Sequence, residues 1–471
     1  MPVHQSYPPV TPETIARLRQ IAGSSHVMTD DETVDDYSHD ETEDLVFRAA
    51  VVVEPGTTEE VSAILKLAAE AGIPVTPRAG GTGLSGGALP VHGGILLSMK
   101  RFNRILEIDR ANVMAVVEPG VITEVFQNAV EAEGLFYPPD PASRGSCHLG
   151  GNLAECSGGP RAVKYGVTKD YVLGLEAVLP NGEIIRTGGK LLKNVTGYNL
   201  TQLIIGSEGT LAVITRITFR LIPLPPCRET LMAAFDSPED ACRTVSSLFL
   251  GGVVPSACEF MERDAVESSC RHLGRTIPNR DAAAHLLIEV DGPGPAEVRA
   301  QAERVAEIVM VGGARDVILA DGLAKQNELW AIRRATGEAV KKRAVYKEED
   351  TVVPRAALPE LLRGVKSICS RYGVTSVCYG HAGDGNLHVN LLKENITDHE
   401  WNEKLPLCIE EIFRHTCSLG GTISGEHGIG YVQKRYLPIA FTAAEMAILK
   451  SVKSAFDPKG ILNPGKIFPD E

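Results

Sequence analysis

Two histidines, and a glutamate–histidine pair further along the chain, are the residues best suited to chemistry. His381 and His388 flank Asp384-Gly385, and an Asp-Gly pair between apolar segments predicts a two-residue hairpin with a type I′ turn. Such a turn would place His381 directly across from His388, with Cβ atoms roughly 4.5–5.5 Å apart. Two imidazoles at this separation can bind one metal ion.

A carboxylate that completes such a site occurs downstream. Gly425-Glu426-His427-Gly428 supplies Glu426 and another imidazole, between glycines that allow close backbone approach. We therefore predict His381, His388 and Glu426 as ligands of a divalent metal with open coordination positions, which leaves His427 as an acid or base. Zinc suits two histidines and one glutamate best, and manganese or iron also accept this set. The set indicates an enzyme.

Simpler interpretations of these residues stay open. His381 and His388 could be a polar cross-strand pair, and Glu426 could be a structural partner in a salt bridge. Asp384 and Asn386 suit turn formation better than catalysis.

Length and composition are those of a multidomain globular protein. With 471 residues, 44% apolar and 23% charged, the chain can build two or more substantial cores. A net charge of −13 without a long basic tract argues against a nucleic-acid partner. No apolar run approaches the roughly 18 residues of a membrane span. Residues Met1 to Val10 lack the basic start and apolar stretch of a signal peptide.

Cysteine usage bears on redox chemistry. The ten cysteines include no C-x-x-C pair, so the sequence encodes neither an iron–sulfur cluster nor a zinc ribbon. We expect reduced thiols in a cytoplasmic protein. Electrons removed from a substrate would therefore have to leave through another cofactor or a partner.

Hydrophobic patterning predicts alternating strands and helices before a proline-rich boundary at residues 223–226. A helix is expected over 57–71, with Thr57 and Glu60 spaced as a capping box and Gly72 as its C-terminal stop. Strands are expected at 50–55, 73–77, 94–99, 115–118, 173–179 and 211–221, and a second helix at 123–133 with Val125, Phe126, Ala129 and Val130 on its apolar face.

The alternation resumes beyond the boundary. Strands are expected at 231–235 and 284–290, and helices at 238–250 and 295–311, followed by the histidine hairpin. A last helix is expected over 442–456, with Thr442 and Glu445 as a capping box. The architecture predicted from these elements is α+β in at least two parts.

A glycine-rich run near the N-terminus matches the dinucleotide fingerprint G-x-G-x-x-G in spacing only. Residues 87–94, which follow Gly81 to Gly86, are too rich in glycine and proline to form the helix that the fingerprint must open. We therefore reject a Rossmann NAD site. The run from Pro77 to Gly87 still exposes successive backbone N–H groups that suit a phosphate, although a simple glycine turn is equally compatible with it.

Two further glycine-marked segments favour a binding role. Pro138 to Ser143 leads into Gly150-Gly151-Asn152, an irregular stretch too long to be a mere connection. Gly206 to Leu211 precedes an expected strand. Three backbone-rich loops in one domain suit a large, extended ligand such as a dinucleotide.

Four motifs, in this order, resemble those of flavin-linked 2-hydroxy-acid dehydrogenases of the vanillyl-alcohol-oxidase (PCMH) type. They are Pro77 to Gly83, Gly206 to Leu211, Gly425 to Gly430 and Phe456 to Lys466. The likeness extends from about Asp44 to the end, and it is greatest for glycolate oxidase catalytic subunits and FAD-linked D-lactate dehydrogenases.

The resemblance implies a fold and a noncovalently bound FAD. Residues 1–222 would form a PCMH-type FAD-binding domain of two α+β subdomains, and residues 223–420 an α/β substrate (cap) domain with the metal hairpin. Residues 421–471 would form a C-terminal helical segment that returns to the FAD domain. The implied cofactor contacts are Arg78, Gly80, Gly81, Thr82, Gly83, Leu84, Ser85, Pro139, Asp140, Ser143, Gly150, Asn152, Glu208, Gly209, Ile214 and Asn463.

The resemblance also implies roles at the reaction site. His381, His388 and Glu426 match metal ligands and His427 matches a catalytic base. The resemblance further implies that Arg333 grips the substrate carboxylate, with Lys347 and Asn390 as further polar contacts. A solvated basic helix face is the simpler interpretation of Arg333 and Arg334. Thr336 falls one residue short of the threonine position of the D-2-hydroxyglutarate dehydrogenases, which weakens the case for their dicarboxylate specificity.

The expected function is FAD-dependent, metal-assisted oxidation of D-lactate or glycolate to the 2-oxo acid, with hydride transfer to the flavin. Electrons would then pass to an external acceptor, such as an iron–sulfur subunit or an electron-transferring flavoprotein. A homodimer, and a peripheral place at the inner membrane through that partner, are compatible with this interpretation. The alternatives are a D-2-hydroxyglutarate dehydrogenase and a non-redox flavoprotein of the same fold.

Overall fold

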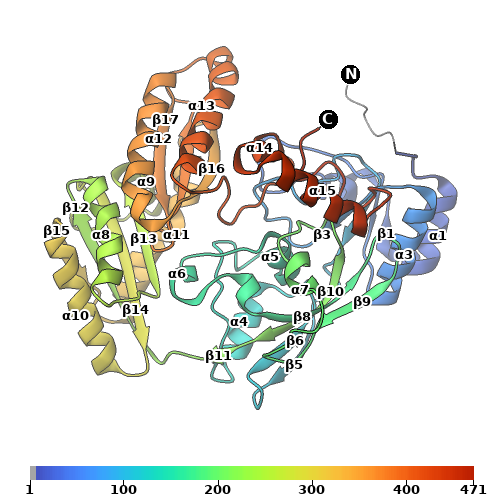
Figure 1. Cartoon of the computed structure of the whole chain (residues 1–471), viewed down its shortest axis with the longest axis horizontal. Helices are drawn as coiled ribbons and strands as arrows, with labels where there is room; N and C mark the ends of the chain where they lie inside the picture. The colour runs from blue at the N-terminus through green and yellow to red at the C-terminus, as the bar shows by residue number, and fades with distance from the viewer. Residues whose placement is uncertain (1–6, 471) are drawn as a thin grey trace.

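The chain folds into two α+β bodies that lie side by side (Figure 1). The computed structural model describes residues 7–470, so residues 1–6, part of the segment considered for a signal peptide, and residue 471 lie outside it. The first body, blue to green, contains three sheets, and the second, yellow to orange, contains one large sheet. Among the described residues, no helix combines the length and apolar character needed to cross a bilayer.

A four-stranded sheet with the order β1-β2-β4-β3 begins the first body. Its elements are α1 (Pro12–Ala22), β1 (Val27–Met28), α2 (Asp31–Asp36), β2 (Val51–Val53), α3 (Thr58–Ala71), β3 (Val75–Arg78) and β4 (Ile95–Ser98). Helices α1 and α3 share one core with the sheet. Helix α3 confirms the predicted N-cap and C-terminal stop, because Thr57 accepts the Glu60 N–H at 3.1 Å and Gly72 adopts a left-handed conformation. The capping box is incomplete, because the Glu60 side chain accepts the N–H of Gly56 (2.7 Å) in place of that of Thr57.

An antiparallel five-stranded sheet with the order β5-β6-β10-β8-β9 completes this body. Its strands are β5 (Ile105–Asp109), β6 (Met114–Val117), β8 (Val172–Val178), β9 (Ile184–Gly188) and β10 (Val213–Arg220), with α4 (Thr123–Glu131), α5 (Leu149–Glu155), α6 (Ala162–Tyr165) and α7 (Leu200–Ile204) around them. A small ribbon pairs β7 (Leu135–Phe136) with β11 (Ile222–Pro223) beside the proline-rich boundary.

Two local predictions in this body were wrong. Val125 is 53% exposed, whereas Gln127 is 3% exposed and donates to the carbonyls of Tyr137 and Pro139. The buried face of α4 is therefore partly polar, which an apolar pattern cannot show. The stretch through residues 149–155, expected to be irregular, forms α5 despite its paired glycines.

The second body is built on a seven-stranded sheet with the order β15-β12-β14-β13-β17-β18-β16. The strands are β12 (Cys227–Phe235), β13 (Ala257–Glu262), β14 (Ala284–Gly292), β15 (Ala314–Leu319), β16 (Tyr346–Val352), β17 (Thr375–Gly380) and β18 (Asn386–Leu392). Helices α8 (Pro238–Leu250), α10 (Pro295–Val311), α12 (Leu358–Tyr372) and α13 (Asp398–Ser418) share one core with the sheet, and α9 (Arg263–Leu273) and α11 (Gly322–Lys341) share another.

The predicted bounds of α8 and α10 are confirmed at both ends. Each begins with a proline, whose fixed φ and missing N–H suit the first position of a helix. Short 3₁₀ turns elsewhere are η1 (Ser24–His26), η2 (Thr168–Asp170), η3 (Arg355–Ala357) and η4 (Lys434–Tyr436).

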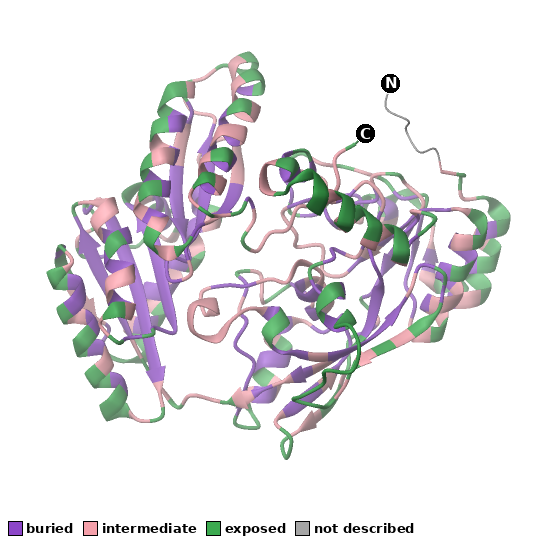
Figure 2. Cartoon of the chain, viewed as in Figure 1, coloured by how far each residue is buried: buried purple, intermediate pink, exposed green. Residues whose placement is uncertain are grey.

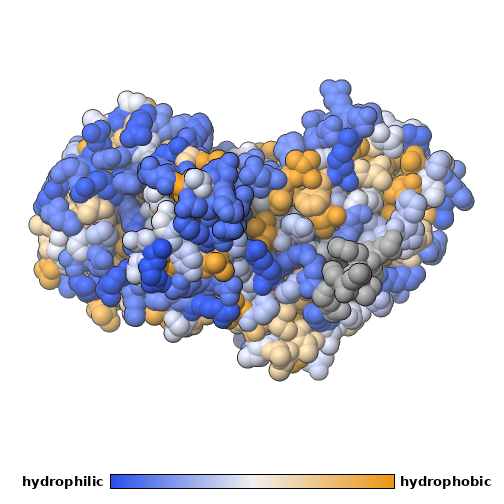
Figure 3. Space-filling model, turned by 90° about the horizontal axis from the view of Figure 1, so that it is seen from above, coloured by the Kyte–Doolittle hydropathy of each residue, from blue (hydrophilic) through white to orange (hydrophobic). Residues whose placement is uncertain are grey.

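The end of the chain returns from the second body to the first. After α14 (Leu437–Ala440) and α15 (Ala443–Phe456), Leu462 pairs with Val75 of β3, and Ile461 and Leu462 enter the core of the four-stranded sheet. Helix α15, with the predicted capping box, lies mainly exposed on the surface (Figure 2). The face seen from above is mostly hydrophilic, with apolar residues in small patches (Figure 3).

We predict that Lys453 holds α15 onto the first body. Its Nζ donates to the carbonyls of Thr210 (2.7 Å) and Leu462 (2.8 Å) and pairs with buried Asp457 (2.6 Å). Because Lys453→Met leaves Asp457 buried without its cation, we expect a loss of about 3 kcal/mol in the free energy of unfolding. Urea unfolding measures it, with exposed Lys193→Met as the control; equal effects of the two changes would contradict the prediction.

Candidate active site

The histidine hairpin has a longer turn than predicted. Strands β17 and β18 pair Tyr379, not His381, with His388, and residues 381–385 form the connection. Gly385 has a φ of +87°, but Asp384 is not in the left-handed region, so the type I′ turn was a wrong prediction. The two imidazoles still meet, with ring centroids 5.2 Å apart and edge to face.

These histidines converge on Glu426. His381 Nε2 lies 3.2 Å and His388 Nε2 lies 3.6 Å from Glu426 Oε1, and one ligand atom from each residue lies within 4.8 Å of the others. Burial opposes ionisation of Glu426, but His381 and His388 lower the pKa of its carboxyl to about 2. Two ring nitrogens and one carboxylate oxygen that face a common point are a donor set fit for a divalent metal.

Glu259 on β13 orients His381 from behind. Its carboxylate, fully buried, lies 2.8 Å from His381 Nδ1, which directs the Nε2 atom toward Glu426. A carboxylate in this position behind a metal-binding histidine fixes the ring and its tautomer. Burial opposes ionisation of Glu259, yet His381 and Arg333 hold its pKa below the ordinary value.

Arg333 of α11 joins this network. Its Nη2 lies 2.7 Å from Glu259 Oε2, and its guanidinium lies over the Tyr379 ring at 5.2 Å. The buried Nε has no hydrogen-bond partner. Arg333 lines the cavity, and its guanidinium has N–H groups beyond the one paired with Glu259, so it has capacity for an anionic ligand there.

The loop that carries Glu426 and His427 is held by backbone hydrogen bonds. Asp350 Oδ2 accepts the N–H groups of Gly425 (2.8 Å), Glu426 (2.7 Å) and His427 (2.9 Å). Its other oxygen accepts from Asn386 at 2.6 Å. Asp350, His388 and His427 also have ligand atoms close together, but the Asp350 oxygens are committed to these bonds, so this residue positions the loop.

The imidazole of His427 stacks on His388, with centroids 5.1 Å apart and planes 6° from parallel. Burial favours the neutral form of His427, but Asp350, Glu348 and Glu426 raise the pKa of its imidazole overall. It lines the same cavity as Arg333 and the three converging residues. The ring is therefore placed to hold a proton beside whatever occupies that cavity.

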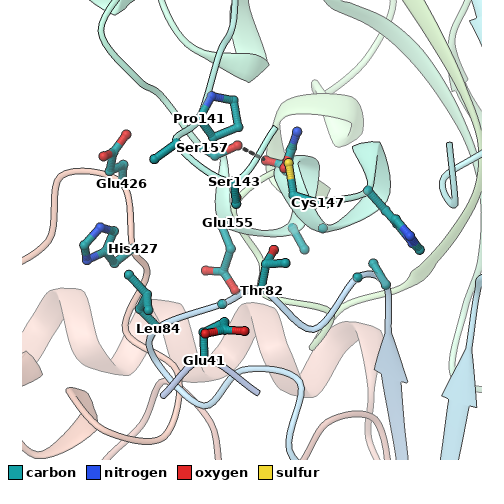
Figure 4. A pocket seen from close by; sticks show the side chains of 18 of the residues that line it. Glu41, Thr82, Leu84, Pro141, Ser143, Cys147, Glu155, Ser157, Glu426 and His427 are labelled. Atoms are coloured by element: carbon teal, nitrogen blue, oxygen red, sulfur yellow. Dashed lines mark hydrogen bonds between the residues drawn. The ribbon is translucent and has the colours of Figure 1, made fainter. Parts of the chain in front are cut away.

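A cavity of about 690 Å³ joins this cluster to the glycine-rich segments. Figure 4 shows Glu426 and His427 on one loop, with Thr82 and Leu84 of the glycine run and Ser143 nearby. The predicted cofactor contacts that line the cavity are Arg78, Gly80, Gly81, Thr82, Gly83, Leu84, Asp140, Ser143, Gly150, Asn152, Glu208, Gly209 and Ile214. Ser85, Pro139 and Asn463 lie outside the lining.

The glycines fit a tightly held dinucleotide. A side chain at Gly83 would meet no atom within 4 Å, so the backbone faces open space at this point. A Cβ at Gly80 would come within 2.9 Å of the Ser146 carbonyl, and one at Gly150 within 2.5 Å of Pro119. Only glycine lets these segments approach one another and still present backbone to a ligand.

The two remaining predicted contacts lie away from the cavity lining. Lys347 pairs with Glu43 at 3.1 Å, and the alternation of β16 places its side chain on the face opposite Glu348. Asn390, two residues beyond His388 on β18, is fully buried, and both atoms of its side-chain amide lack partners. Both assignments stay predictions.

Sequence patterns missed the carboxylates that support the site. Glu259, Asp350 and Glu348 are buried or half-buried, yet they stand in strands far from the histidines in the sequence. A buried carboxylate is rare unless it is paired. Charged residues within otherwise apolar strands were therefore the available signal.

Comparisons with known proteins show the family of this chain. Residues 224–467 match the family described as FAD linked oxidases, C-terminal domain, and residues 49–188 match the FAD binding domain family. The chain is 41% identical to the glycolate oxidase subunit GlcD of Bacillus subtilis, over 92% of each chain. It is 38% identical to a D-lactate dehydrogenase of Anaerostipes hadrus, over 98% of each chain.

A solved structure shares the fold. p-Cresol methylhydroxylase superposes with a TM-score of 0.80 at 18% identity, over 97% of this chain and 96% of that one. The expected PCMH-type, two-part α+β fold and its FAD-binding domain are thereby confirmed. The chain belongs to the FAD-linked oxidase family.

Proposed function

We propose that this flavoenzyme oxidises a small D-2-hydroxy acid, D-lactate or glycolate, to the 2-oxo acid with the help of a divalent metal. The observation that carries the proposal is the single cavity that joins the glycine segments to His381, His388, Glu426, His427 and Arg333. Substrate, metal and flavin would thus share one enclosed space. The names of the glycolate and D-lactate relatives support the substrate class.

The charges around the three proposed metal ligands favour the binding of a cation between them. Glu259 pairs with Arg333 at 2.7 Å and Glu348 pairs with Lys341 at 2.8 Å, so each has a fixed positive partner. The pairs that Glu426 forms within residues 7–470 are with the imidazoles of His381 and His388. A bound Zn²⁺, Mn²⁺ or Fe²⁺ would neutralise it and, as a Lewis acid, would lower the pKa of a substrate hydroxyl.

The chain's own residues supply the remaining steps. His427 accepts the proton of the substrate hydroxyl, a role that suits an imidazole which lines the cavity and has carboxylates close by. Arg333 orients the substrate carboxylate through the guanidinium with which it lines the cavity. FAD supplies the acceptor for the hydride that leaves the α-carbon.

Electrons then pass to an external acceptor, which we propose is an iron–sulfur protein or an electron-transferring flavoprotein. All ten cysteines are free thiols and most are buried. No cysteine belongs to either candidate metal group among residues 7–470. A route through the flavin to a partner is therefore the simplest one.

A D-2-hydroxyglutarate dehydrogenase is the second candidate. Arg144 and Arg334 line the same cavity as Arg333, and Arg334 lies over the Trp330 ring. A second carboxylate on the substrate could bind there. Thr336 offers no help, since it is fully buried and its hydroxyl lies 3.0 Å from that of Ser269.

We predict that one hydroxy acid bleaches the flavin in a metal-dependent manner. The purified protein should show the spectrum of oxidised flavin. Anaerobic D-lactate or glycolate should reduce the flavin, and prior chelation of the metal should prevent this reduction. Added zinc or manganese should restore the reduction, because the ligand set is rebuilt. The measurement is the visible spectrum before and after each addition, with D-2-hydroxyglutarate compared alongside.

Each outcome decides between the candidates. Faster reduction by D-2-hydroxyglutarate would favour the second candidate. Reduction that survives chelation would contradict the metal. A flavin that none of the acids reduces would contradict the dehydrogenase and favour the non-redox alternative.

We predict that Arg333→Lys lowers kcat/KM for the hydroxy acid by about 100-fold, because lysine cannot reproduce the fork that binds Glu259 and a carboxylate together. Arg334→Lys is the matched control and should change kcat/KM for a monocarboxylate substrate by less than about threefold. Steady-state kinetics with saturating metal measure both. Equal losses in the two variants would place the substrate carboxylate elsewhere.

A further inference from the structure

Glu155 is a cavity residue that the proposed reaction leaves unused. It is the last residue of α5, and its carboxyl lies between Thr82 and His427 in the cavity (Figure 4). A Cβ on Gly428 would collide with its Oε2, and one on Gly87 would come within 3.0 Å of its Oε1. The carboxyl is therefore held between the glycine run and the loop of His427.

The Glu155 carboxyl lacks the partners that an ionised group requires. Its Oε2 is buried without a hydrogen-bond partner. The nearby cation, Lys466, donates to the carbonyl of Leu89 (2.5 Å) and to Asn463 Oδ1 (3.3 Å). No ion pair to Glu155 is formed within residues 7–470.

A second carboxylate beside it differs in its partners. Burial raises the pKa of Glu208 as well, but Glu208 accepts the N–H groups of Ile429 (2.8 Å) and Gly430 (2.6 Å), which oppose that rise and stabilise its ionised form. Burial, followed by the charges of Glu208 and Asp40, raises the pKa of Glu155 well above its usual range. A protonated carboxyl has one O–H to donate, and within residues 7–470 the buried Oε2 of Glu155 has no partner to receive it.

The position of Glu155 indicates the receiver. The α-carbon of the substrate must meet both His427 and the reacting end of the flavin, and Glu155 lies against Gly428, the neighbour of His427. We propose that Glu155 is a neutral carboxylic acid that donates a hydrogen bond to the bound flavin ring. The inference rests on the proposed function in one respect: the flavin ring is placed at the His427 end of the cavity because His427 is proposed to act on the substrate.

Such a donor would change the reduction potential of the flavin. Reduction adds electron density to the ring, and a hydrogen bond to the more negative state is the stronger one. Glu155 would therefore favour reduced over oxidised FAD. The contribution is separate from that of His427, which acts on the substrate.

The test compares Glu155→Gln, which keeps an N–H donor, with Glu155→Met, which has none. Redox titration of each holoenzyme with a reference dye gives the affinity ratio of reduced to oxidised FAD without any hydroxy acid. We expect the affinity ratio of Glu155→Gln to stay within twofold of that of the unchanged protein. The ratio of Glu155→Met should fall about tenfold, which is equivalent to a decrease of about 30 mV in the two-electron potential. Glu59→Gln, an exposed carboxyl on α3 outside the cavity lining, is the control and should have no effect.

A second measurement covers the case in which Glu155→Met does not fold. Infrared difference spectra of flavin reduction in the unchanged protein should show a shift of a carboxylic-acid C=O band that Glu155→Gln removes. An unchanged ratio in Glu155→Met, an equal loss in both variants, or the absence of that band would overturn the proposal. Because no substrate is used, failure here is distinct from failure of the hydroxy-acid assignment.

Discussion

Buried carboxylates that accept backbone N–H groups hold together the loop on which the site depends. Asp350, from the second body, accepts the amides of residues 425–427, and Glu208, from the first, accepts those of residues 429 and 430. A loop of this length has no ladder of its own to satisfy these amides. The reacting residues are therefore in place only when the two bodies are packed together.

This arrangement explains the many charges in the site. A carboxylate that is buried for its hydrogen bonds needs opposing charge, and Arg333 and Lys341 supply it for Glu259 and Glu348. The same arginine and carboxylate then fix the His381 ring. Structural support and chemistry thus use one network, so a change in either part alters both.

Local signals in the sequence predicted the local structure well. The prolines at the starts of α8 and α10 and the glycine after α3 have a direct steric effect, so both ends of α8 and α10 and the last residue of α3 are as predicted. The hairpin register failed because Asp384-Gly385 is part of a five-residue connection, whose length depends on contacts with other segments, such as the bond from Gly383 N to the Cys258 carbonyl. The two histidines still meet, because residue 381 follows Tyr379, the partner of His388, by two positions, and side chains two residues apart in an extended chain point to the same side.

Long-range partners could not be read from the sequence, and β16 shows why. Its residues Lys347-Glu348-Glu349-Asp350 put charges on both faces of a strand that is largely buried, so no apolar alternation tells which face meets the cavity. In the structure Glu348 and Asp350 face the site, while Glu349 bonds to Gln433. A shift of one residue in the register of β16 would turn Glu348 and Asp350 away from the site and turn Lys347 and Glu349 toward it. Only the pairing of β16 with β18, which sets Asp350 opposite His388, decides it.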